Sequence, residues 1–87
     1  MMVPSIHLNG TSRARLLNDA MRQAGALRVA LDAMRHTGPN GRDFYPQGAN
    51  ALDHAEREHN DRCNRIQLVL NEVEELAQAI ADAPGPQ

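Results

Sequence analysis

The chain of 87 residues has no lysine, one cysteine, only two aromatic residues and no long apolar run. Because Cys63 is the single cysteine, no intrachain disulfide can form. No stretch approaches the ~18 consecutive apolar residues that a membrane span needs. The first residues also lack the basic and apolar segments of a secretory signal, so we expect a cytoplasmic protein.

The charged residues are unevenly distributed. All nine basic residues are arginine, and eleven acidic residues bring the net charge to −2. Residues 1–42 carry six arginines and two acidic residues, a charge of +4. Residues 43–87 carry three arginines and nine acidic residues, a charge of −6. An acidic total argues against DNA or RNA as a partner. The absence of lysine fits either a GC-rich genome or selection for bidentate anion recognition, to which arginine is better suited.

Two segments have the apolar periodicity of amphipathic helices. Residues 12–37 and residues 51–82 each place apolar side chains at alternating steps of three and four, as in a helix that packs along one seam. Residues 1–10 lack this pattern and predict a short extended arm, and residues 83–87 predict a frayed tail. The predicted seams are Leu17, Ala20, Ala24, Leu27, Leu31 and Met34 in the first helix, and Leu52, Ala55, His59, Arg62, Ile66, Val69, Val73, Leu76 and Ile80 in the second.

This pattern predicts an all-α fold in which a single domain, residues 1–87, forms an antiparallel two-helix hairpin. A chain this small buries little of its surface, so we expect a helical-bundle homo-oligomer. The second helix is longer than the first and overhangs it by about two turns. Either the arm, through Ile6 and Leu8, or another subunit covers that overhang.

The segment between the helices, residues 38–50, is unusual for a connection. Helix–helix connections usually take ~2–8 residues, and this one contains three glycines and two prolines, which restrict the backbone. We therefore predict an ordered loop. Asn40-Gly41 within it favours a turn with positive φ.

The same loop contains both aromatic residues of the chain, Phe44 and Tyr45. In one interpretation they close the open end of the hairpin core. In the other the loop binds a ligand: Arg42 holds a phosphate or carboxylate, an aromatic ring stacks on a base, and the backbone N–H groups of Asn40 and Gly41 bind an anion. The two interpretations are compatible if one ring is covered and the other faces the ligand.

Two polar residues, His59 and Arg62, interrupt the apolar seam of the second helix. Antiparallel pairing places them opposite Leu27–Leu31. Three interpretations fit this interruption. The two side chains rotate out of a wide seam, they form a buried polar layer that fixes the register of an oligomer, or they face a ligand.

Further candidate anion sites lie on the first helix. Arg28 and Arg35 are seven residues apart and share a face, and Arg42 follows in the loop. The three arginines form either a solvated flank or an anion-binding wall. Thr11 and Ser12 precede the first helix, where they serve either as a plain N-cap or as part of an anion cradle at the helix start.

The sequence lacks the motifs of common catalytic and metal sites. His54 and Glu58 share a helix face, but His59 is rotated ~100° further, and no HExxH motif is present. Cys63 lies in an apolar stripe, which favours packing over nucleophilic chemistry. We therefore expect a non-enzymatic protein with no metal and no cofactor.

The motif Pro39-Asn40-Gly41-Arg42-Asp43 between two helices resembles the P-x-G-R-[E/D] turn of small phage proteins that sequester the cyclic nucleotide signals of bacterial immunity, the anti-CBASS and anti-Thoeris sponges. Leu52-Asp53-His54-Ala55 is similar to their L-E-E-A. The resemblance implies a non-enzymatic oligomer in a bacterial host, with intersubunit pockets for a cyclic oligonucleotide or ADP-ribose-type signal held by Arg42. The alternative is a phage structural or accessory subunit, or an inhibitor of a host protein.

Overall fold

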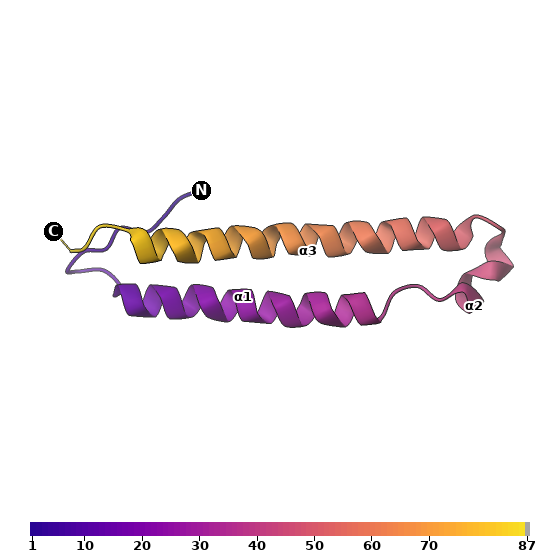
Figure 1. Cartoon of the computed structure of the whole chain (residues 1–87), viewed down its shortest axis with the longest axis horizontal. Helices are drawn as coiled ribbons and strands as arrows, with labels where there is room; N and C mark the ends of the chain where they lie inside the picture. Colours follow the sequence, from indigo (N-terminus) through magenta and orange to yellow (C-terminus); the bar gives the residue numbers. More distant parts are fainter. Residues whose placement is uncertain (87) are drawn as a thin grey trace.

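The computed structural model describes residues 1–86 and shows a long, thin helical hairpin (Figure 1). Helix α1 spans Arg13–His36, helix α2 spans Gly41–Phe44, the 3₁₀ turn η1 spans Tyr45–Gln47, and helix α3 spans Ala51–Asp82. The molecule measures 64 × 19 × 16 Å. Residues 1–86 contain no strand, so the predicted all-α hairpin is confirmed.

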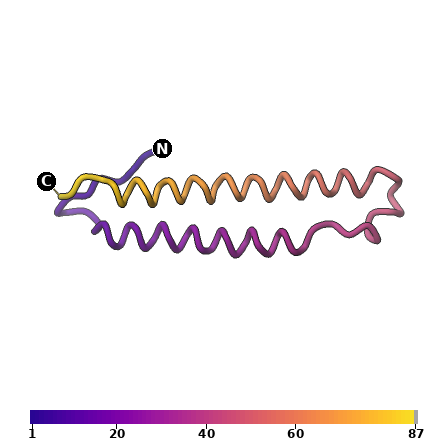
Figure 2. The backbone as a smooth tube through the Cα atoms, in the orientation of Figure 1, coloured from indigo at the N-terminus to yellow at the C-terminus, as the bar shows by residue number. Residues whose placement is uncertain are grey.

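The two long helices lie side by side along the whole of α1, with the N-terminal arm and the C-terminal segment at one end and α2 at the other (Figure 2). Residues 1–7 of the arm form neither helix nor strand. No helix within residues 1–86 is long and apolar enough to cross a membrane.

The predicted helix bounds agree with the structure to within one residue. Helix α1 begins after Ser12, whose hydroxyl accepts a hydrogen bond from the amide of Arg15 at 3.2 Å, as expected of an N-cap. Helix α3 begins after Asn50, as the sequence predicts, although the Asn50 side chain makes no capping hydrogen bond.

The connection between the long helices is more regular than the sequence predicts, because it contains α2 and η1. The predicted positive-φ turn at Asn40-Gly41 is wrong. Asn40 has φ −109° and accepts a hydrogen bond from the amide of Arg42 at 2.9 Å, so it caps the start of α2. Within residues 1–86 the only positive φ is at Gly48.

The core of the hairpin is a single row of side chains between α1 and α3. Its buried members are Ala24, Leu31, Cys63 and Leu70. The seam predicted for α1 is confirmed, since Ala20, Ala24 and Leu31 are its buried positions.

The seam predicted for α3 is shifted by one residue at three positions beyond His59, while Ile66, Val73 and Ile80 lie at the seam as predicted. Arg62 and Val69 are exposed, whereas Cys63 and Leu70 are buried. From Leu52 the observed seam takes steps of three, four and four to reach Cys63. Such an 11-residue spacing rotates the apolar stripe relative to a heptad. The observed seam of α3 is therefore Leu52, Ala55, His59, Cys63, Ile66, Leu70, Val73, Ala77 and Ile80.

The overhang of α3, which has 32 residues against 24 in α1, lies at its N-terminal end, because Arg13 at the start of α1 is level with Ile80 near the end of α3. There α2 and η1 pack against α3 and cover it. The arm lies at the opposite end of α3, where Ile6 is buried and Leu8 is 81% exposed. The prediction that the arm or another subunit covers the overhang is therefore wrong.

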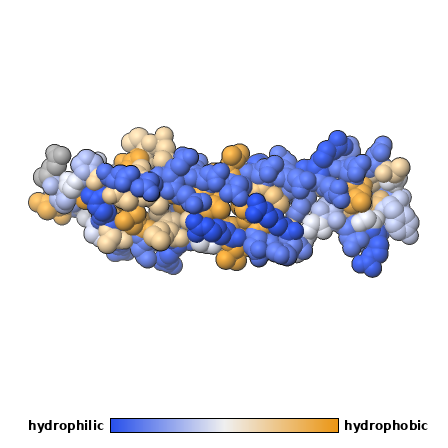
Figure 3. All heavy atoms as spheres, viewed as in Figure 1, coloured by the Kyte–Doolittle hydropathy of each residue, from blue (hydrophilic) through white to orange (hydrophobic). Residues whose placement is uncertain are grey.

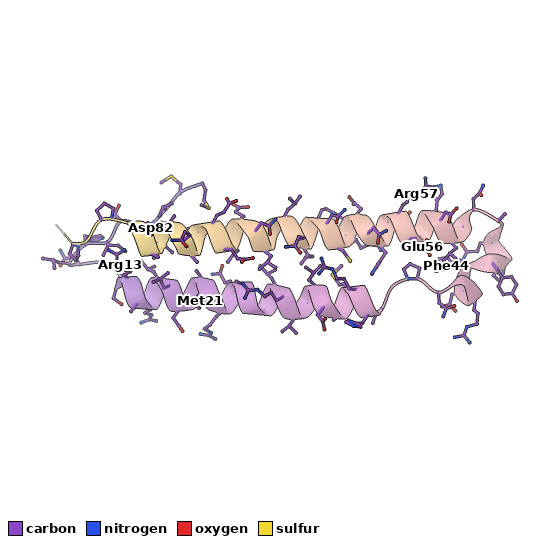
Figure 4. The ribbon with its side chains drawn as sticks, in the orientation of Figure 1. Arg13, Met21, Phe44, Glu56, Arg57 and Asp82 are labelled. Atoms are coloured by element: carbon purple, nitrogen blue, oxygen red, sulfur yellow. The ribbon has the colours of Figure 1, made fainter. Side chains whose placement is uncertain are left out.

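One arginine ties the start of α1 to the end of α3 (Figure 4). Arg13 Nη1 donates to the carbonyl oxygen of Ile80 at 2.7 Å and to that of Ala81 at 3.1 Å. The last carbonyls of a helix have no partners within it and carry partial negative charge. A guanidinium there satisfies these acceptors and fixes the register between the helices.

The observed seam predicts opposite outcomes for two leucines that lie two residues apart. Leu70→Ala removes a buried side chain and lowers the free energy of unfolding by about 2–5 kcal/mol. Leu68→Ala, at a position that is 66% exposed, changes it by less than about 0.5 kcal/mol. Urea denaturation followed by circular dichroism measures both. Equal losses in the two variants contradict the observed phase of α3.

The contact of Arg13 predicts a measurable loss of stability in Arg13→Ala. Removing the guanidinium leaves helix carbonyls without a donor, so the free energy of unfolding falls by about 1–2 kcal/mol. Arg15→Ala is the matched control, because only the backbone amide of Arg15 takes part in the N-cap. Thermal denaturation of both variants is the measurement, and a loss in Arg15→Ala as large as in Arg13→Ala argues against the role of this contact.

Candidate functional site

The end of the hairpin opposite the termini contains a hollow of about 490 Å³, here called the tip pocket. Its walls come from α2, η1 and the start of α3, which meet because η1 turns the chain back onto α3. The pocket is open to solvent and combines a guanidinium, a phenol ring and an aliphatic side chain. The lining residues are Gly41, Arg42, Tyr45, Gly48, Ala49 and Leu52.

The two aromatic residues of the loop have different environments. Phe44 is half-buried and lies beside the start of α3 (Figure 4). Tyr45 is 76% exposed and lines the tip pocket. One ring therefore packs on the hairpin while the other remains available, which is the combined interpretation that the sequence left open.

Arg42 is exposed at the edge of the pocket, and it makes no ion pair with any other described residue. Its backbone amide is already bonded to the side chain of Asn40. The guanidinium of Arg42 is thus one group that the tip offers to an anion, and the role of the backbone N–H groups of Asn40 and Gly41 stays a prediction. Gly41 and Leu52 lie close together in the wall of the pocket, because a Cβ added at Gly41 would be 3.4 Å from Leu52 Cδ2.

Arg28 and Arg35 on α1 each make one contact to α3. Arg28 Nη2 lies 3.3 Å from Glu74 Oε2, and Arg35 Nη2 donates to Gln67 Oε1 at 3.2 Å. They line hollows other than the tip pocket, so the structure does not bring them together with Arg42 into one anion-binding wall.

The predicted pairing of His59 and Arg62 with Leu27–Leu31 is wrong. Arg35 contacts Gln67 and His59 lies beside Gly38, which is seven residues beyond Leu31 toward the tip. A Cβ at Gly38 would lie 3.6 Å from the His59 ring. The ring nitrogen Nε2 of His59 is 3.6 Å from Cys63 Sγ, and His59 is half-buried.

Arg62 takes a different position from His59. It is exposed and pairs with Glu58 at 3.5 Å along the same helix. Of the three interpretations of the interrupted seam, rotation out of the seam describes Arg62. His59 stays at the seam and packs against the chain where it leaves α1.

The hairpin is 64 Å long. Thr11 and Ser12 lie at one end of it and the tip pocket lies at the other. The Ser12 hydroxyl acts as the N-cap of α1. A single chain therefore does not bring these residues together with Arg42.

Within residues 1–86 no three His, Cys, Asp or Glu side chains come together in a way that could hold a metal ion. Cys63 is buried in the seam. Sequence reasoning missed Gly48, Ala49 and Leu52 as lining residues of the tip pocket. The sequence predicts a seam position for Leu52. Only in the structure, where η1 turns the chain back onto α3, does the Leu52 side chain also border the pocket.

Comparison of the chain with protein-family models, curated proteins and solved structures finds no significant match.

The shape of the tip depends on Gly48, which has φ +117°. Gly48→Ala forces a side chain into a strained backbone region and lowers the free energy of unfolding by about 1–3 kcal/mol. Gly25→Ala is the contrasting control. It lies inside α1 with no atom within 4 Å of an added Cβ, and it raises the free energy of unfolding by about 0.5–1 kcal/mol. Chemical denaturation gives both values, and stabilisation by Gly48→Ala contradicts the observed tip geometry.

Proposed function

We propose that the chain is a non-enzymatic binding protein whose recognition site is the tip pocket. Its proposed ligand is a nucleotide signal of bacterial immunity, a cyclic oligonucleotide or an ADP-ribose-type molecule. Binding would sequester that signal, as in a phage or prophage anti-defence protein. The proposal includes self-association into a helical-bundle homo-oligomer, since few side chains are buried within one chain.

The observation that carries this proposal is that Arg42 and Tyr45 line the same hollow and are both exposed. A guanidinium is suited to bidentate contact with phosphate, and an aromatic ring stacks on a nucleobase. Leu52 adds an apolar surface beside them. The resemblance of Pro39–Asp43 to the turn of the immune-signal sponges supports the same ligand class.

A second candidate function is a protein–protein interaction module, in which the tip is a rigid epitope for another protein. The openness of the tip favours it, because Tyr45 is 76% exposed. Tyrosine and arginine are enriched among the residues that dominate binding energy at protein interfaces. A phage structural or accessory subunit and an inhibitor of a host protein both fit this description.

Isothermal titration calorimetry with a panel of cyclic di- and trinucleotides and cyclic ADP-ribose tests the proposed function. We expect binding that Arg42→Ala weakens about 10- to 100-fold, because a hydrogen bond to a charged group contributes roughly 1.5–3 kcal/mol. Tyr45→Ala weakens it by a similar factor through lost stacking, and Tyr45→Phe retains most of the affinity.

The matched control is Arg22→Ala, which removes an exposed arginine of α1 that lies outside the tip pocket. It leaves the affinity unchanged. If no compound of the panel releases or absorbs heat, the nucleotide proposal is rejected and the protein-binding candidate remains. If Arg22→Ala weakens binding as much as Arg42→Ala, the ligand is held by the diffuse positive charge of residues 1–42 rather than by the tip pocket.

A further inference from the structure

The two broad faces of the hairpin differ in chemistry. In an α-helix each residue is rotated by ~100° from the previous one, so residues three and four positions from a buried residue lie on opposite sides of it. On α1, Leu27 and Arg28 lie on opposite sides of the buried line through Ala24 and Leu31. On α3, Ile66 and Gln67 lie on opposite sides of the buried line through Leu70.

The polar sides of the two helices share one face. The evidence is that Arg28 contacts Glu74 and that Arg35 contacts Gln67, both across the line between α1 and α3. On the face seen in Figure 3, hydrophilic side chains lie across that line. The remaining sides of the helices must therefore meet on the opposite face.

That opposite face, here called the apolar face, carries large aliphatic side chains from both helices. Four of them pack against the buried cluster from outside, and none is fully covered within one chain. Val69 is 46% exposed and the others are half-buried. The apolar face consists of Leu16, Leu27, Met34, Ile66, Val69, Val73 and Leu76.

No other described segment of the chain covers the middle of this face. The arm contacts the far end of α3, near Ala79 and residues 82–85. The segments α2 and η1 contact the opposite end of α3. The cover must therefore come from outside the chain.

We propose that a second copy of this chain covers the apolar face, so that two hairpins stack face to face into a four-helix bundle. The described residues contain only seven buried apolar side chains, and a small chain with so small a core is marginally stable. A second copy is present wherever the chain is made, so it can always supply this cover. This inference extends the proposed function, which includes self-association, by naming the surface.

The dimensions of the hairpin support a stable pair. Alongside the 24 residues of α1, about 36 Å in length, the hairpin is 19 Å wide, so the flat area of the two-helix face is roughly 680 Å², close to the ~800 Å² that each partner contributes to a typical stable interface. A two-fold axis in the plane of the contact places the same patch on both copies, as an isologous interface requires. Helix pairs across such an interface pack side chain into side chain as in other four-helix bundles.

Light scattering after size-exclusion chromatography, on the full chain, tests the interface with two valines. Val69→Glu places a charge on the apolar face, and we expect it to shift the mass from dimer to monomer. Val29→Glu is the matched control: Val29 is 71% exposed on α1, away from that face, and its variant remains a dimer. Both substitutions replace exposed valines, so neither clashes with the fold of a single hairpin. A monomeric mass of the unchanged chain, or a dimer that survives Val69→Glu, overturns the proposal.

A second measurement does not depend on disrupting the fold. In a Cys63→Ala background, Val69→Cys and Val29→Cys are alkylated with iodoacetamide at several protein concentrations. We expect the thiol at position 69 to become more protected as the concentration rises, while the one at position 29 reacts at a constant rate. Protection at position 69 that is independent of concentration rejects the interface. Neither experiment uses a nucleotide, so failure of the tip pocket to bind a signal leaves these outcomes unchanged.

Discussion

The structure depends on a single shared row of apolar contacts between α1 and α3. Ala24 and Leu31 from one helix meet Cys63 and Leu70 from the other, and no third layer supports them. Because two helices have only each other to pack against, every other contact of the chain extends or closes this row. The hydrogen bonds of Arg13 to the last carbonyls of α3 close it at one end.

The tip pocket follows from the difference in length between the two helices. Since α3 extends beyond α1, its first turns need cover, and α2 and η1 provide it. Phe44 is used for that cover, whereas Tyr45 next to it in sequence faces outward. The same fold back brings Arg42 and Leu52 to one hollow. Covering the first turns of α3 thus also brings the guanidinium of Arg42 and the ring of Tyr45 to one hollow.

The division of the hairpin into a polar and an apolar face explains the roles of several arginines. Arg28 and Arg35 were expected to line an anion-binding wall. Instead, the guanidinium of Arg28 pairs with Glu74 and that of Arg35 donates to Gln67. These partly exposed contacts add little stability individually. They mark the polar face of the hairpin, and the aliphatic sides of both helices lie on the opposite face.

The sequence by itself determined the number, type and bounds of the long helices, because apolar periodicity and the N-cap at Ser12 are local properties. One of its alternatives covered one loop aromatic and turned the other to a ligand without deciding which, and the structure half-buries Phe44 and exposes Tyr45. It placed Cys63 in the apolar stripe of α3 but did not decide which positions form the centre of the seam, because heptad and 11-residue spacings overlap in a stripe of alanines and aliphatic residues. Only the packing against α1 selected Cys63 and Leu70 over Arg62 and Val69. The tip pocket was likewise decided by tertiary structure, since residues from α2, η1 and α3 become neighbours only when the chain folds back.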